Sequence, residues 1–74
     1  MDQERLVYMV NQIARNFAAQ GETEAIMQTA KHIKDFWDPH MRAALLKVET
    51  TKLEPLAQKA VAQLIISKEQ WHSE

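Results

Sequence analysis

Three short breaks in a helix-favouring sequence constrain the fold more than any other feature. The chain has a single Gly and two Pro in 74 residues. Gly21 suits the left-handed backbone that is common where a helix ends, whereas Pro39 and Pro55 suit the first position of a new helix. Ala, Leu, Gln, Glu and Lys are common between these breaks and favour helix over strand. The sequence therefore predicts an all-α fold, a small bundle of three to four short helices.

Apolar side chains recur every three or four residues between the breaks, which places each set along one side of a helix. This pattern predicts one domain over residues 1–74, with helices at about 2–19, 23–37, 39–48 and 55–68. The expected stripes are Leu6, Met9, Val10, Ile13 and Phe17; Ile26, Ala30, Ile33 and either Phe36 or Trp37; Met41, Leu45 and Val48; and Leu56, Ala60, Val61, Leu64 and Ile65. The short connection at Gly21 implies an antiparallel hairpin of the first two helices. Asp38 is expected to end the second helix and to cap the third by accepting the backbone N–H of His40 or Met41.

The small core leaves the chain in need of support. With no Cys it has neither a disulfide nor a thiolate metal site, which are the usual supports of very small proteins. Apolar burial and conformational entropy nearly cancel in a chain of this size. Binding to a partner protein is the remaining way to stabilise the fold.

Charge and hydropathy argue against nucleic-acid and membrane partners. The formal net charge is −1, and the cationic residues are spread among acids, so a phosphate-binding surface is not indicated. The N-terminus lacks a basic segment followed by an apolar run, and apolar runs such as Leu64-Ile65-Ile66 are far too short to span a bilayer. We therefore expect a cytoplasmic protein.

No residue pattern predicts a metal or cofactor site. His32, His40 and His72 have no neighbours at helical spacing that would complete a set of metal ligands. There is also no Gly-rich loop able to hold a phosphate.

Catalytic arrangements are also missing. Asp35 and Asp38 could share a proton, but this needs a cleft that four short helices can barely form, so capping is the favoured role of Asp38. Ser67 and Ser73 have no neighbouring base and acid. The sequence predicts no catalytic residue.

Two segments are candidates for contact with a partner. Adjacent helical residues point about 100° apart, so one ring of Phe36-Trp37 should be buried and the other partly outside. An outward ring beside Met41 and Arg42 would suit an interface, although both rings could instead close the end of the bundle. Asn11 and Gln12, in mid-helix, could hydrogen-bond to another segment or chain or form a solvated polar face.

These segments carry a family resemblance. Phe36-Trp37-Asp38-Pro39-His40-Met41-Arg42, with His32-Ile33 before it and Leu45-Leu46 after it, resembles the signature stretch of the delta subunits of NAD-dependent formate dehydrogenases. Asn11-Gln12-Ile13-Ala14 is similar to the N-terminal motif of that family. Glu24-Ala25 is similar to the pair at the start of the family's second helix. Leu53-Glu54-Pro55-Leu56 resembles the C-terminal part of the family more weakly. His40 stands where the family usually has Arg, and Thr29 stands where the family has a small residue, commonly Gly.

The resemblance implies an accessory subunit of a cytoplasmic complex that oxidises formate and reduces NAD. Molybdenum-bis-pterin, iron–sulfur clusters and the flavin FMN would belong to the larger subunits, and none would be bound by this chain. Its role would be assembly or stability of the active complex. The absence of Cys agrees, because iron–sulfur clusters need thiolate ligands.

Two hypotheses follow. In the first, the chain docks on the molybdenum-containing catalytic (alpha) subunit through a surface that includes Trp37, Asp38, Met41 and Arg42, with Asn11 and Gln12 as further candidates. In the second, it associates with itself to complete a homodimeric helical bundle.

Overall fold

The structure is a computed structural model that describes the backbone of residues 2–72 and the side chains of residues 2–66. Its elements, in chain order, are α1 (Gln3–Phe17), the 3-10 turn η1 (Ala18–Gln20), α2 (Glu22–Phe36), α3 (Pro39–Leu45), the 3-10 turn η2 (Thr50–Lys52) and α4 (Pro55–His72). Residues 2–72 contain no β-strand. The predicted all-α bundle is therefore confirmed.

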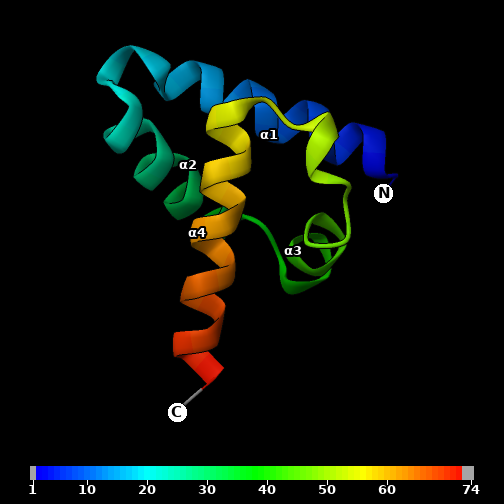
Figure 1. Ribbon diagram of the computed structural model, residues 1–74. Coiled ribbons are helices and arrows are strands. Elements are labelled where there is room, and N and C mark those ends of the chain that lie inside the picture. Colours follow the sequence, from blue (N-terminus) through cyan, green and yellow to red (C-terminus); the bar gives the residue numbers. More distant parts are fainter. Residues whose placement is uncertain (1, 73–74) are drawn as a thin grey trace.

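In Figure 1, α1 crosses the top of the molecule, and α2, α3 and α4 lie below it. After Gly21, α2 folds back beneath α1, and α4 descends beside α2 in the same direction. The short α3 lies below the N-terminal half of α1, and the C-terminal half of α4 extends beyond the rest of the molecule. None of the described helices is long and apolar enough to cross a membrane.

The helix boundaries follow from local capping chemistry. A carboxylate oxygen of Asp2 accepts the backbone N–H of Arg5 at 2.8 Å, and Asp38 accepts that of Met41 at 2.8 Å. Each carboxylate satisfies a donor that has no partner within its own helix. Gly21 has a φ of 99°, a conformation that L side chains rarely adopt. The predicted break at Gly21 and the predicted cap at Asp38 are both confirmed.

Two helices differ in length from the prediction. The third ends at Leu45 and not near residue 48, because the chain tightens there: the N–H groups of Lys47 and Val48 bond to carbonyls three residues back, each at 3.1 Å. This turn still carries Val48 into the core. The fourth helix continues to His72, past the predicted end near residue 68.

The core is built where α1, α2 and α4 meet, and many of its members are small. Ala14, Ala30 and Ala57 belong to this core, and Ala lets helix backbones approach closely. Most of the expected stripe positions are buried, but α4 buries Ala57, whereas Leu56 is half-buried and Ile65 is exposed. The core cluster is Leu6, Val10, Ala14, Ala30, Ile33, Trp37, Leu45, Val48, Leu53, Ala57, Val61 and Leu64.

The neighbouring rings of Phe36 and Trp37 give a direct test of this packing. Trp37 is 6% exposed and belongs to the core, whereas Phe36 is 75% exposed. We expect Trp37→Ala to lower the free energy of unfolding by about 3 kcal/mol or more, because it leaves a large cavity. Phe36→Ala should change it by less than about 0.5 kcal/mol. Urea denaturation of both variants measures the difference, and equal losses would contradict the assignment of the two rings.

Thr29 provides a second test, since its side chain is fully buried and its hydroxyl has no hydrogen-bond partner among the described residues. Thr29→Val keeps the shape and removes the unpaired polar group, so we expect it to stabilise the protein by about 1 kcal/mol. Thr29→Ser keeps the hydroxyl and loses a methyl group, so it should destabilise. Thermal denaturation distinguishes the two, and a Val variant less stable than the wild type would show that the hydroxyl is satisfied in solution.

Candidate partner-binding surface

The connection between α2 and α3 contains the sequence segment that was expected to contact a partner. Trp37 had been proposed as part of that outward surface, and the structure corrects this: its ring fills the core. The reason is geometric, because the extended backbone at Trp37, with a ψ of 137°, leaves the helix and turns the ring inward. Phe36 is the exposed ring instead.

Phe36 is held by a neighbouring side chain one helical turn earlier. Its ring lies against that of His32, with ring centroids 4.8 Å apart and planes tilted by 38°. A pair four residues apart on a helix can make this contact. The exposed Phe36 ring therefore has a defined orientation at the end of α2.

Arg42 fixes the geometry of the same junction. Its Nη1 donates to the backbone carbonyl of Lys34 at 3.0 Å, near the C-terminus of α2, where carbonyl groups lack helical partners and attract cations. The side chain thus connects α3 to the end of α2. Arg42 is half-buried, so a contact with a partner would have to use the exposed part of its guanidinium group.

Met41 and Asp38 border a shallow groove between α1 and α3. The groove has a volume of about 360 Å³ and is lined by Leu6, Asp38, His40, Met41 and Ala44. Its floor is mostly apolar, and Asp38 and His40 are its polar side chains. Asp38 and Met41 therefore line one groove, and Arg42 follows Met41 on the same short helix.

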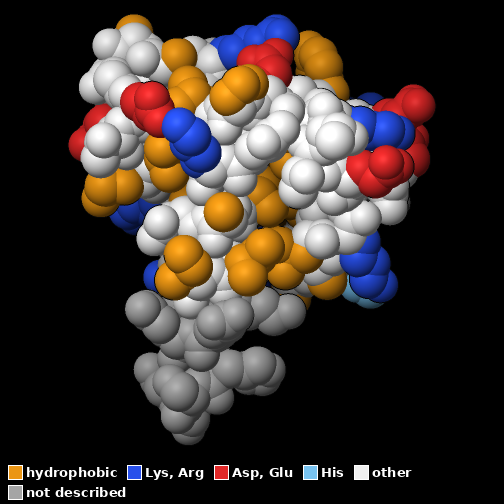
Figure 2. Space-filling model, viewed as in Figure 1, with side chains coloured by type: hydrophobic (Ala, Val, Ile, Leu, Met, Phe, Trp, Pro, Cys, Tyr) orange, Lys and Arg blue, Asp and Glu red, His pale blue; other side chains and the backbone are white. Residues whose placement is uncertain are grey.

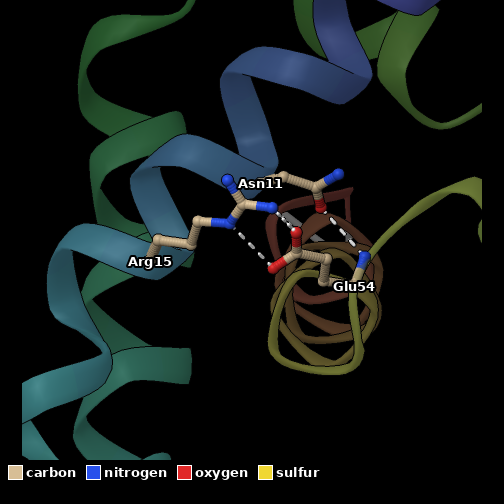
Figure 3. Close-up of polar contacts among 3 residues, drawn as sticks. All are labelled: Asn11, Arg15 and Glu54. Atoms are coloured by element: carbon tan, nitrogen blue, oxygen red, sulfur yellow. Dashed lines mark hydrogen bonds and ion pairs between the residues drawn. The ribbon is translucent and has the colours of Figure 1, made fainter.

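Asn11 lies elsewhere and has an internal role (Figure 3). Its side-chain oxygen accepts the backbone N–H of Glu54 at 2.9 Å, at the start of α4. From the next turn of α1, Arg15 donates to both carboxylate oxygens of Glu54. The hydrogen bond that Arg15 donates to Glu54, together with the negative charge of Glu54, raises the pKa of Arg15. The Asn11 side chain thus joins two segments of the same chain, while Gln12 remains exposed.

The candidate chemical groups are occupied by structural contacts. Asp35 pairs with Lys31 at 2.6 Å, and this hydrogen bond holds the pKa of Asp35 below its usual value. Asp38 caps α3, so the two carboxylates do not share a proton. No group of three potential metal-ligating side chains occurs in the described part of the chain. The side chains of His72, Ser67 and Ser73 lie outside the described residues.

Comparison with known protein families shows what the chain is similar to. The family model described as the NADH-dependent formate dehydrogenase delta subunit, FdsD, matches residues 5–61. This range contains the α1 motif, the α2–α3 junction and the start of α4. No curated protein and no solved structure is significantly similar to the chain. Because the family model covers most of its length, the chain belongs to the formate dehydrogenase delta-subunit family.

Substitutions of Asn11 and of its neighbour Gln12 test the structural role of Asn11. Asn11→Ala leaves the N–H of Glu54 without its acceptor, so we expect the free energy of unfolding to fall by about 1 kcal/mol. Gln12→Ala removes an exposed side chain and should change stability by less than about 0.5 kcal/mol. Chemical denaturation provides the comparison. A loss at Gln12 as large as that at Asn11 would contradict the structural role.

Proposed function

We propose that this member of the delta-subunit family is a non-catalytic accessory subunit of a cytoplasmic NAD-dependent formate dehydrogenase. It supports the assembly or stability of the molybdenum-containing catalytic subunit. The observation that carries the proposal is the family match over residues 5–61. The chemistry of the described residues supports an accessory role, because carboxylates such as Asp35, Asp38 and Glu54 serve in ion pairs or as a helix cap.

The residues of this chain do not fit the cofactors of such an enzyme. The sequence has no Cys, whereas iron–sulfur clusters are held mainly by Cys thiolates. It has no Gly-rich phosphate loop of the kind that holds nucleotides, and the described side chains form no metal-ligand cluster. We therefore assign molybdenum-bis-pterin, the iron–sulfur clusters, FMN and NAD to other subunits.

The contact with the catalytic subunit is proposed to centre on the α2–α3 junction. Phe36 is the anchor in place of Trp37, with Met41 and the exposed parts of Asp38 and Arg42 around it. Aromatic, Met and Arg side chains are enriched at interfaces, and a few of them carry most of the binding energy. The ring of Phe36 contacts that of His32 before binding, and any restriction that this contact places on the ring lowers the entropy lost on association.

A self-associating bundle is the second candidate, and it is favoured by the apolar residues that α4 leaves exposed. Ile65 and Ile66 are both large and accessible. Sedimentation at micromolar concentration distinguishes a homodimer from a monomer that needs the enzyme subunits.

The accessory role is tested by purifying the tagged chain from its native host and assaying formate-dependent NAD reduction in the eluate. We expect the molybdenum subunit to co-purify with activity. Phe36→Asp should reduce its recovery at least about tenfold, since losing an interface anchor costs 2 kcal/mol or more. Far-UV circular dichroism should remain helical in this variant.

Tyr8→Asp is the matched control, since Tyr8 is 64% exposed on α1. It should leave recovery unchanged. Recovery of the wild-type chain alone would contradict the accessory role, whereas full recovery with Phe36→Asp would contradict only the proposed contact.

A further inference from the structure

The chain changes direction at the α2–α3 junction over a short extended segment. α2 ends at Phe36, the backbone of Trp37 is extended with a ψ of 137°, and α3 begins at Pro39. In a helix that continued, the carbonyl of Lys34 would accept the N–H of Asp38, four residues later. The extended backbone takes Asp38 out of the helix. The carbonyl of Lys34 is therefore one of the helix-end groups that need a donor from elsewhere.

Arg42 supplies that donor from α3. Its Nη1 donates to the carbonyl of Lys34 at 3.0 Å, and its backbone N–H donates to the carbonyl of Asp38, also at 3.0 Å. The side chain of Arg42 is thus bonded to the last turn of α2, while its backbone is bonded to the start of α3. The cationic guanidinium group also suits the negative end of the α2 dipole. Together these bonds close the segment from Lys34 to Arg42 into a loop.

The exposed ring of Phe36 lies within this closed loop. Its neighbour Trp37 is buried in the core, and packing there does not depend on the bond between Arg42 and Lys34. The last turn of α2, which carries Phe36, is held by that bond. The ring of Phe36 also contacts that of His32. Loss of the Arg42 bond would therefore free the direction of the Phe36 ring without opening the core.

The junction lies at the end of α2 away from Gly21. In Figure 1 the connection leaves the lower end of α2, passes behind α4 and reaches α3. Figure 2 shows apolar side chains at this lower end of the described surface. An aromatic anchor contributes most when it fits a pocket on the partner, and such a fit needs a defined direction of the ring. The bond from Arg42 supplies that direction.

We propose that Arg42 is a positioning residue for the Phe36 anchor: it strengthens binding to the larger formate dehydrogenase subunits by fixing the last turn of α2, and not through a contact of its own. The inference rests on the proposed function, because the partner is assigned there. It refines that contact, in which Arg42 borders the anchor. A side chain that is already ordered loses less entropy on association than one that must be ordered by the partner.

A double-mutant cycle tests this role in the binding of the purified chain to the larger subunits, expressed without it. We expect Arg42→Gln to weaken binding about three- to tenfold, because Phe36 must then be ordered on association. In the Phe36→Ala background the same change should weaken binding less than about twofold, since the anchor that Arg42 positions is absent. Equal losses in both backgrounds would show that Arg42 contacts the partner directly, which contradicts the proposal.

Two further variants are controls for the charge of Arg42. Lys52→Gln removes an exposed cation from η2, and we expect binding to stay within about twofold of the wild type. Arg42→Lys keeps the positive charge and a donor at the same position, so it should weaken binding less than Arg42→Gln. A loss with Arg42→Lys as large as that with Arg42→Gln would contradict the role of the hydrogen bond.

NMR of the free chain tests the position of the ring without any partner. The ring current of Phe36 displaces the resonances of the His32 ring protons, and Phe36→Ala provides the reference without this displacement. At the same pH, Arg42→Gln should move the His32 resonances toward that reference, while those of core residues such as Val10 and Leu64 stay in place. His32 resonances identical to those of the wild type would contradict the proposal.

The outcomes separate this inference from the proposed function. If the wild-type chain does not bind the larger subunits, the proposed function fails, and the role of Arg42 in binding fails with it. If the wild type binds and the cycle shows no coupling between Arg42 and Phe36, only this inference is wrong.

Discussion

The position of α4 is the constraint on which the rest of the structure depends. Without it, α1 and α2 would expose the apolar faces that now pack against Ala57, Val61 and Leu64. Asn11 and Arg15 hold the first turn of α4 from α1, and Lys59 joins α4 to the start of α2. The exposed ion pairs add little energy in water. The hydrogen bond from the Glu54 N–H to Asn11 matters more, because it is partly buried and satisfies a backbone donor at the helix start.

This arrangement joins two segments that lie far apart in the sequence. The Asn-Gln motif of α1 and the Leu-Glu-Pro-Leu start of α4 contact each other through the Asn11 and Glu54 groups (Figure 3). Asn11, which the sequence suggested as a partner contact, is thus part of the internal structure. The α2–α3 junction combines both roles: Trp37 fills the core and Arg42 secures the end of α2, while Phe36 stays outside.

A small bundle with exposed apolar residues fits a protein that works within a complex. Its interior includes several Ala side chains, each of which buries less apolar surface than a larger residue would. The remaining large apolar side chains, among them Phe36 and Ile66, are available for contact. Binding to larger subunits would then stabilise the chain by mass action, since a partner that binds only the folded form favours folding. The subunit would stabilise the enzyme, and the enzyme would in turn stabilise the folded subunit.

The sequence by itself determined the helical class, the breaks at Gly21 and Asp38-Pro39, the cap at Asp38 and most of the buried stripes. These features depend on backbone preferences and on the helical repeat, which act over a few residues. The sequence pattern also showed that Phe36 and Trp37 face different directions. It could not show which ring is inside, because that depends on the extended backbone at Trp37 and on the neighbours α3 brings to it. The partner of Asn11 lies 43 residues along the chain. Only the packing of α4 on α1 brings the two together, so that contact was decided by the tertiary structure.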